Sequence, residues 1–152
     1  MNTTPNESAA IYTALVVDDS LAERERIKVL LGRRGVNVVC VGDGEQALKC
    51  LKKPLFDIVL CDWELPCVSG LDICREVRQM PLSSRPYFVM ITGRSQRVDL
   101  IAAMDAGADD FIRKPLWEEE LRVRLSLASQ IIAWRRVVKQ AGLTDAVQQS
   151  SQ

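Results

Sequence analysis

Short apolar runs alternate with amphipathic segments along most of this chain, and this alternation is the feature that most constrains its fold. The apolar runs are residues 15–17, 38–41, 58–61, 88–91 and 111–112. Segments with helical spacing of apolar residues follow each run, at 21–34, 44–51, 71–80, 98–106 and from 117 onward. Strands that are apolar throughout suit a parallel sheet covered by helices on both faces. The alternation therefore predicts one α/β domain, an open doubly wound sheet of five parallel strands.

Composition excludes several kinds of chemistry. The chain of 152 residues contains no His, which rules out a Ser-His-Asp triad, a His general base and His metal ligands. Twenty Lys and Arg balance twenty Asp and Glu, so the formal net charge is zero. That balance argues against a protein that binds nucleic acid directly through a basic face.

The cysteines and the first residues indicate the compartment. Five cysteines contain no Cys-x-x-Cys pair, and we expect them to be buried, unbonded thiols in a reducing environment. Residues 1–12 lack the basic and apolar regions of a signal peptide, and no apolar run approaches the roughly 20 residues of a membrane helix. A cytoplasmic protein without a membrane segment is expected.

Polar residues end four of the five predicted strands. Asp18 and Asp19 follow the first apolar run and Asp62 follows the third, while Thr92 and Lys114 come after the fourth and fifth. In a flavodoxin-like strand order, 2-1-3-4-5, strands one and three are neighbours at the switch point. Any one of these residues could be an ordinary turn or capping residue. Their joint placement predicts a functional crevice at the carboxyl edge of the sheet.

The residue types in this crevice predict phosphoryl chemistry. Three clustered carboxylates repel one another, and a hard divalent cation relieves the repulsion, with Mg²⁺ preferred and Mn²⁺ as the alternative. A carboxylate can attack a phosphoryl group and form an acyl phosphate. Lys114 can stabilise the charge on the transferred group, and the Thr92 hydroxyl can donate to one of its oxygens. The set therefore indicates an aspartyl-phosphorylation site.

Four segments resemble the receiver domain of bacterial two-component response regulators, the CheY-like family. They are LVVDDS, DIVLCDWELPCVSG, MITG and AGADDFIRKP, in the family's order and spacing. The resemblance covers about residues 14–130. It implies a signalling switch that accepts a phosphoryl group from a sensor histidine kinase or a phosphotransfer protein. Such a domain is not chiefly an enzyme, since it catalyses only its own phosphoryl transfer and dephosphorylation.

The resemblance also implies a role for each matching residue. The roles are phosphoacceptor for Asp62, metal binding for Asp18, Asp19 and the backbone carbonyl of Glu64, phosphoryl contact for Thr92 and Lys114, and switch aromatic for Phe111. The peptide bond between Lys114 and Pro115 is typically cis in the family. On phosphorylation Thr92 would shift toward the phosphoryl group and Phe111 would pack into the vacated space, changing the surface of the fourth helix, fifth strand and fifth helix.

Some positions depart from the commonest family pattern. Glu64 lies two residues after the phosphoacceptor and Arg94 two after Thr92, at positions that modulate phosphoryl lifetime in the family. Their opposite charges can pair across the mouth of the site. Phe111 lacks the hydroxyl of the more frequent tyrosine, so its switch would form no new hydrogen bond.

The last helical segment carries two apolar stripes. The first, Leu121, Leu125, Ala128 and Ile132, is assigned to the core of the domain. The second includes Val123, Leu127, Ile131, Trp134 and Val138 and has coiled-coil spacing. We expect a tail at 1–12, a receiver domain at 13–130, and a helical extension with a polar tail at 131–152. We also expect a homodimer whose seam is Leu127, Ile131, Trp134 and Val138.

Two other readings stay open from the sequence. A haloacid-dehalogenase-like phosphatase also uses an Asp nucleophile, a Lys and a Thr, although its nucleophile follows the first strand in an Asp-x-Asp pattern and residue 20 here is Ser. A receiver that is never phosphorylated could serve as a dimerising scaffold. The tail at Leu143–Ala146 resembles the entry of a diguanylate cyclase output domain, which follows an extended receiver helix in some regulators.

Overall fold

The chain forms a five-stranded, fully parallel sheet in the order β2-β1-β3-β4-β5, in a computed structural model that describes residues 12–94 and 96–142. The strands are β1 (Thr13–Val17), β2 (Asn37–Val41), β3 (Ile58–Asp62), β4 (Tyr87–Thr92) and β5 (Asp110–Arg113). The helices are α1 (Leu21–Gly32), α2 (Gly44–Leu51), α3 (Gly70–Arg78), α4 (Arg97–Ala106) and α5 (Glu118–Gln140). The predicted flavodoxin-like architecture with an extended last helix is confirmed.

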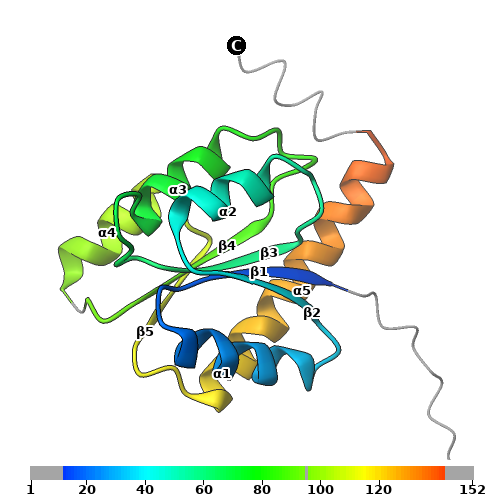
Figure 1. Cartoon of the computed structure of the whole chain (residues 1–152). Helices are drawn as coiled ribbons and strands as arrows, with labels where there is room; N and C mark the ends of the chain where they lie inside the picture. Colours follow the sequence, from blue (N-terminus) through cyan, green and yellow to red (C-terminus); the bar gives the residue numbers. More distant parts are fainter. Residues whose placement is uncertain (1–11, 95, 143–152) are drawn as a thin grey trace, which may run out of the picture.

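Helices cover both faces of the sheet (Figure 1). Side chains from one face of the sheet pack with α2, α3 and α4 around Phe88 and Met90. Those from the other face pack with α1 and α5 around Leu60 and Ile112. Successive residues of a strand point to opposite faces, so the continuous apolar runs of the inner strands supply both cores at once.

Several details of the elements differ from the sequence expectation. Helix α1 ends at Gly32 rather than Arg34, and the chain then turns through Gly35 in a left-handed conformation, with φ of 73°. Strand β2 is partly exposed rather than buried on both faces, because it is the edge of the sheet. Trp117 is the N-cap residue of α5 rather than its first helical residue. Asp62 and Thr92 are the last residues of their strands, whereas the sequence placed them directly after the strands.

The cysteines are all free thiols, but the expectation that they are buried holds only in part. Cys61 and Cys74 are buried, and burial raises the pKa of the Cys74 thiol to about 12. Cys67 is exposed, because it lies in the loop between β3 and α3 with a left-handed φ of 66°. Cys40 and Cys50 are half-buried.

Helix α5 is held to the sheet well beyond residue 130. Its first apolar stripe is buried as expected, with Leu121, Ala128 and Ile132 in the core. Beyond these residues, Arg135 donates to Asp109 at 2.8 Å, and Arg136 donates to Asp57, also at 2.8 Å. Both carboxylates directly precede strands at the amino edge of the sheet. The extension is therefore attached to the domain at least as far as Arg136.

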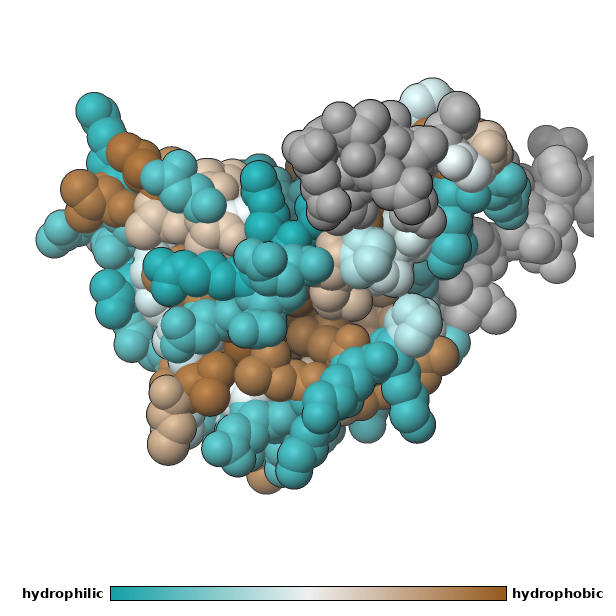
Figure 2. Space-filling model, turned by 90° about the horizontal axis from the view of Figure 1, so that it is seen from above, coloured by the Kyte–Doolittle hydropathy of each residue, from teal (hydrophilic) through white to brown (hydrophobic). Residues whose placement is uncertain are grey.

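The face formed by α2 and α3 carries an apolar groove. Leu48 and Leu51 of α2 and Val77 of α3 line it together with Met80, in a pocket of about 360 Å³. Figure 2 shows this face, where a strip of apolar side chains runs between charged ones.

No helix within the described ranges is long and apolar enough to cross a membrane. Of the expected tail at 1–12, residues 1–11 lie outside the described residues, as does the segment 143–152.

Gly70 is the position where the fold tolerates a side chain least. It begins α3, and a Cβ there would meet the Asp62 carbonyl oxygen and lie 2.8 Å from Trp63 Cα, both of them backbone atoms. We expect Gly70→Ala to destabilise the domain by about 1–3 kcal/mol, the usual range for overpacking. Gly32→Ala is the matched control, since nothing lies within 4 Å of its added methyl group. Its effect should be neutral or stabilising by about 0.4–1 kcal/mol. Urea unfolding followed by circular dichroism measures both, and equal stabilities of the two variants would contradict the assignment.

Candidate functional site

The carboxyl edge of the sheet brings together the acids that the sequence singled out. Asp18 directly follows β1, and its Oδ1 accepts the backbone N–H of Ser20 at 2.8 Å. Ser20 in turn caps α1, with its hydroxyl accepting from the N–H of Glu23. Asp62 ends β3, the strand paired with β1. The predicted neighbourhood of strands one and three is confirmed.

Three carboxylates form a cluster suited to a cation. One oxygen from each of Asp18, Asp19 and Asp62 lies within 4.8 Å of the other two. Asp18 and Asp62 are almost fully buried, whereas Asp19 is exposed at the mouth. Oxygen-only ligands with an open side are typical of Mg²⁺ sites, which keep several waters. The residues present therefore fit a hard divalent cation.

Lys114 reaches this cluster from the end of β5. Its Nζ donates to Asp62 Oδ2 at 2.7 Å and lies 3.5 Å from Asp18 Oδ2. Burial alone would lower the pKa of Lys114, but the hydrogen bond and charge of Asp62, together with Asp18, raise it above the ordinary lysine value. Lys114 is thus a fixed cation beside Asp62. The Lys114–Pro115 peptide bond is cis, as the family resemblance implied.

The surroundings of Asp62 raise the pKa of its carboxyl group above the ordinary value. Burial raises the pKa of the Asp62 carboxyl, and the charge of Asp18 acts in the same direction. Lys114 and the backbone N–H of Glu64, which donates to Oδ1 at 3.0 Å, oppose that rise. A cation bound among the three acids would favour the ionised form that a nucleophile needs.

Glu64 and Arg94 pair across the mouth of the site. Arg94 Nε donates to Glu64 Oε1 at 2.6 Å, which confirms the predicted pairing of these two charges. The same guanidinium lies 4.8 Å from the centre of the Trp63 ring and 3.4 Å from a carboxylate oxygen of Asp99 in α4. Arg94 therefore links the loop after β3 to the first turn of α4. The side chains of Trp63 and Asp99 were not singled out from the sequence, because only the folded chain brings them to Arg94.

Thr92 lies at the end of β4 and is fully buried. Its hydroxyl oxygen accepts the backbone N–H of Arg94 at 3.0 Å, which leaves the hydroxyl proton available to another acceptor.

Arg24 is a further residue that the sequence analysis did not identify. Its guanidinium donates to the Asp18 backbone carbonyl at 2.7 Å and so supports the loop that carries Asp18 and Asp19.

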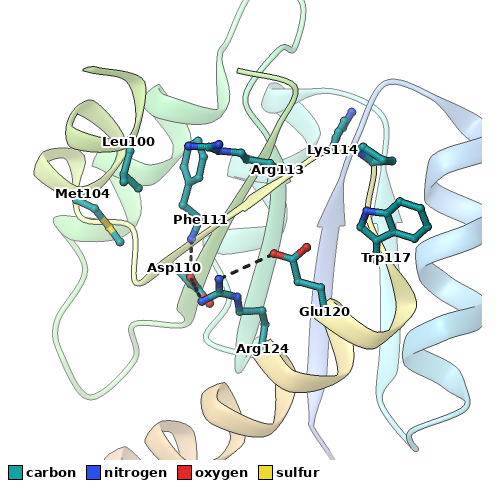
Figure 3. A pocket seen from close by; sticks show the side chains of 10 residues that line it. Leu100, Met104, Asp110, Phe111, Arg113, Lys114, Trp117, Glu120 and Arg124 are labelled. Carbon is teal, nitrogen blue, oxygen red and sulfur yellow. Dashed lines mark hydrogen bonds and ion pairs between the residues drawn. The ribbon is translucent and has the colours of Figure 1, made fainter. Parts of the chain in front are cut away.

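Phe111 lies on the far side of β5 from this loop and is 9 % exposed. It lines an open pocket of about 470 Å³ between α4, β5 and α5, together with Leu100 and Met104 (Figure 3). Across the pocket, Arg124 of α5 contacts Asp110 at 3.3 Å. The aromatic ring is therefore in its buried position, next to a space between the three elements that the family mechanism involves.

The remaining expected residues lie away from this site, on α5. Leu127, Ile131 and Trp134 are exposed, as the second stripe requires. Val138 is half-buried, and its neighbour Val137 is exposed. The seam stays a prediction.

Comparison with known proteins shows which family this chain resembles over most of its length. Residues 14–126 match the response regulator receiver domain. The chain is 37% identical over 111 residues to the DNA-binding response regulator MtrA of Mycobacterium tuberculosis, covering 73% of this chain and 47% of that protein. It is 39% identical over 119 residues to the transcriptional regulatory protein AruR of Pseudomonas aeruginosa, covering 74% and 47%. The chain thus spans about half the length of these curated relatives, and neither name refers to a cyclase.

Solved structures agree with these matches. A response regulator receiver domain protein from Clostridium thermocellum superposes with a TM-score of 0.72 at 27% identity, covering 84% of this chain and 98% of that one. The BeF3-activated DrrB receiver domain gives 0.71 at 26% identity, covering 79% and 98%. With the acidic cluster, Lys114 and the strand order already in place, these matches establish that the chain belongs to the response regulator receiver domain family.

Proposed function

We propose that this receiver is switched by phosphorylation of Asp62. The observation that carries the proposal is the position of the Asp62 carboxylate, 2.7 Å from Lys114 Nζ and within the three-acid cluster. A carboxylate oxygen of Asp62 would attack the phosphorus of a phosphohistidine. The new P–O bond forms as the P–N bond breaks, and the departing imidazole takes up a proton. Lys114 would bind an oxygen of the transferred group.

The proposed cation is Mg²⁺, or Mn²⁺. Its ligands would be Asp18, Asp19, Asp62 and the backbone carbonyl of Glu64. When bound, the ion would neutralise charge on the phosphoryl oxygens. Asp18 is prepared for such a role because Ser20 and Arg24 fix its loop by hydrogen bonds. Asp19 is exposed at the mouth, where it can take part without losing water on every side.

The signal would pass from Asp62 to α4 and β5. The Thr92 hydroxyl can donate to a phosphoryl oxygen while it still accepts from the N–H of Arg94. Movement of Thr92 and Arg94 would then reach α4 through Asp99, and the buried Phe111 would hold the new arrangement. The affected surface is the pocket between α4, β5 and α5 (Figure 3).

The proposed partners are a sensor histidine kinase or a phosphotransfer protein, and the proposed location of this protein is the cytoplasm. We propose no general enzymatic activity beyond the domain's own phosphoryl transfer and dephosphorylation, and no direct binding of nucleic acid by this part of the chain. The family match disfavours a haloacid-dehalogenase-like phosphatase. The complete set of acids around Asp62 favours a phosphorylated receiver over an unphosphorylated scaffold.

We also propose that α5 pairs with a second copy of the chain. Val123, Leu127, Ile131, Trp134 and Val137 are 41–67% exposed along one side of the helix. Burying a large apolar side chain of this kind is worth roughly 1.5–3 kcal/mol. A parallel pair of α5 helices would bury this stripe and direct both carboxyl termini the same way.

Replacing Asp62 by Asn should abolish phosphorylation. The amide oxygen is a poor nucleophile, and a single Asp carries the reaction in the proposed mechanism. The measurement is the intact mass of wild type and Asp62→Asn after incubation with acetyl phosphate and Mg²⁺. Wild type should gain one phosphoryl group. It should gain none when EDTA removes Mg²⁺ before the reaction. A phosphoryl adduct of equal yield in Asp62→Asn would disprove the assignment.

Replacing Asp19 by Asn should weaken Mg²⁺ binding by about tenfold or more, since a divalent site loses one formal charge. Trp63 fluorescence can report the titration, because Trp63 is adjacent to Asp62. Trp117→Phe and Trp134→Phe should be introduced first, so that Trp63 is the one emitting indole. Asp72→Asn, on the exposed first turn of α3, is the matched control. Equal affinity of the Asp19→Asn and control proteins would remove Asp19 from the site.

Placing acids on the exposed stripe should dissociate the dimer. Ile131→Glu with Trp134→Glu removes two large apolar contacts and adds like charges at the same surface. Ala133→Glu with Gln140→Glu adds the same charge at exposed positions outside the stripe. Sedimentation should give a dimer for wild type and the control, and a monomer for the first variant. A monomeric wild type at tens of micromolar, with and without beryllofluoride, would contradict the proposal.

A further inference from the structure

A second polar pocket lies at the amino edge of the sheet, opposite the acidic cluster. It has a volume of about 140 Å³ and lies between α5 and the segments that follow α2 and α3. Four cationic side chains line it, with one carboxylate: Arg85, Arg135, Arg136, Lys139 and Asp57. Ser83 and Ser84 lie on the same wall. The surplus of positive charge stands out in a chain whose net charge is zero.

The cations are only partly neutralised by the protein. Arg136 pairs with Asp57, and Arg135 pairs with Asp109 beside the pocket. Within the described ranges, no carboxylate lies at ion-pair distance from Arg85 or Lys139. The Arg85 guanidinium donates instead to the backbone carbonyls of Arg78, at 2.7 Å, and Met80, at 2.8 Å. Arg85 and Lys139 therefore form no ion pair with the described part of the chain, although the charge of Asp109 acts on Arg85 from farther away.

Backbone hydrogen bonds hold the Arg85 guanidinium in place, although burial and neighbouring cations disfavour its charge. Burial lowers the pKa of the Arg85 guanidinium, and the nearby charges of Arg78 and Arg135 act in the same direction, while Asp109 opposes them. The backbone hydrogen bonds fix the group nevertheless, so it is available without further ordering. Nη1 of Arg135 is also enclosed and has no hydrogen-bond partner among the described residues. An enclosed donor without an acceptor is rare in folded proteins, and an anion in the pocket would supply the acceptor.

We propose that this pocket binds a single phosphate group, supplied by orthophosphate or by a small soluble phosphomonoester. A tetrahedral dianion offers acceptors in several directions, as convergent guanidinium, ammonium and hydroxyl donors require. Arg85 and Lys139 supply positive charge that forms no ion pair within the described residues, and the Ser83 hydroxyl supplies a neutral donor. The pocket admits one such group rather than an extended ligand, given its volume of about 140 Å³.

The site is independent of Asp62 and its cation. Asp57, Asp109 and Arg85 precede strands β3, β5 and β4 at the amino edge, whereas Asp62 ends β3 at the opposite edge. The contacts of Arg135 and Arg136 also attach α5 to this edge. A phosphate group here would add to the attachment of α5 and stabilise the extension of the helix.

Calorimetric titration of the full chain with orthophosphate, and separately with glycerol 3-phosphate, tests the proposal. EDTA keeps divalent metal from the acidic cluster, and NaCl holds the ionic strength constant so that general screening cancels. Wild type should show saturable binding of one equivalent. Arg85→Gln and Lys139→Gln should each weaken it about tenfold or more, the loss expected for one charge-assisted contact. Saturation by both ligands identifies the phosphate group itself as the determinant, and saturation by glycerol 3-phosphate alone identifies the phosphomonoester.

Two controls define the negative outcome. Arg122→Gln removes a cation from the first half of α5, far along the helix from Lys139, and should bind as wild type does. Asp62→Asn should also bind normally, because the acidic cluster takes no part. Lys139 is exposed, so Lys139→Gln keeps the test valid even if Arg85→Gln fails to fold. Absence of saturable heat in wild type, or equal affinity in Lys139→Gln and Arg122→Gln, would overturn the proposal.

Discussion

The mutual repulsion of Asp18, Asp19 and Asp62 is the constraint on which the rest of the structure depends. Three carboxylates within 4.8 Å, two of them almost fully buried, are unfavourable unless cations surround them. Lys114 supplies one positive charge from β5, and a divalent ion would supply the remainder. The parallel sheet makes this arrangement possible because the carboxyl ends of neighbouring strands meet at one edge. The cores on both faces of the sheet hold those strand ends in register, so the energy of apolar burial maintains a cluster that is itself unfavourable.

The two edges of the sheet carry different sets of charged groups. The carboxyl edge holds the acidic cluster with Lys114, and the amino edge holds Arg85 and the two arginines of α5 with Asp57 and Asp109. In the two proposals, the first edge would bind a divalent cation and the second an anion. The two sites would act on the same helix or its neighbours, one through β5 and one through the attachment of α5.

Arg94 and the pair Arg135 and Arg136 perform similar structural tasks at different places. Arg94 joins the loop after β3 to α4, with Trp63 and Glu64 on one side and Asp99 on the other. Arg135 and Arg136 join α5 to the starts of β5 and β3. In each case a planar guanidinium spans two elements by combining an ion pair with an aromatic contact, a geometry that a lysine does not reproduce. These bridges determine which helices can move independently of the sheet.

The sequence by itself determined the fold class, the strand order expected for it and the residues at the acidic edge. It did so because the period of apolar residues and the placement of Asp18, Asp62, Thr92 and Lys114 at strand ends are local properties that a parallel sheet brings together. The tertiary structure alone decided the contacts of Arg24 with the Asp18 loop and of Arg94 with Asp99, and the exposure of Cys67. The pocket around Arg85 was equally inaccessible to sequence reasoning, since its cations come from segments about fifty residues apart. Such contacts depend on the distances and rotations between packed helices and strands. The spacing of residues along the chain and its composition do not specify those distances and rotations.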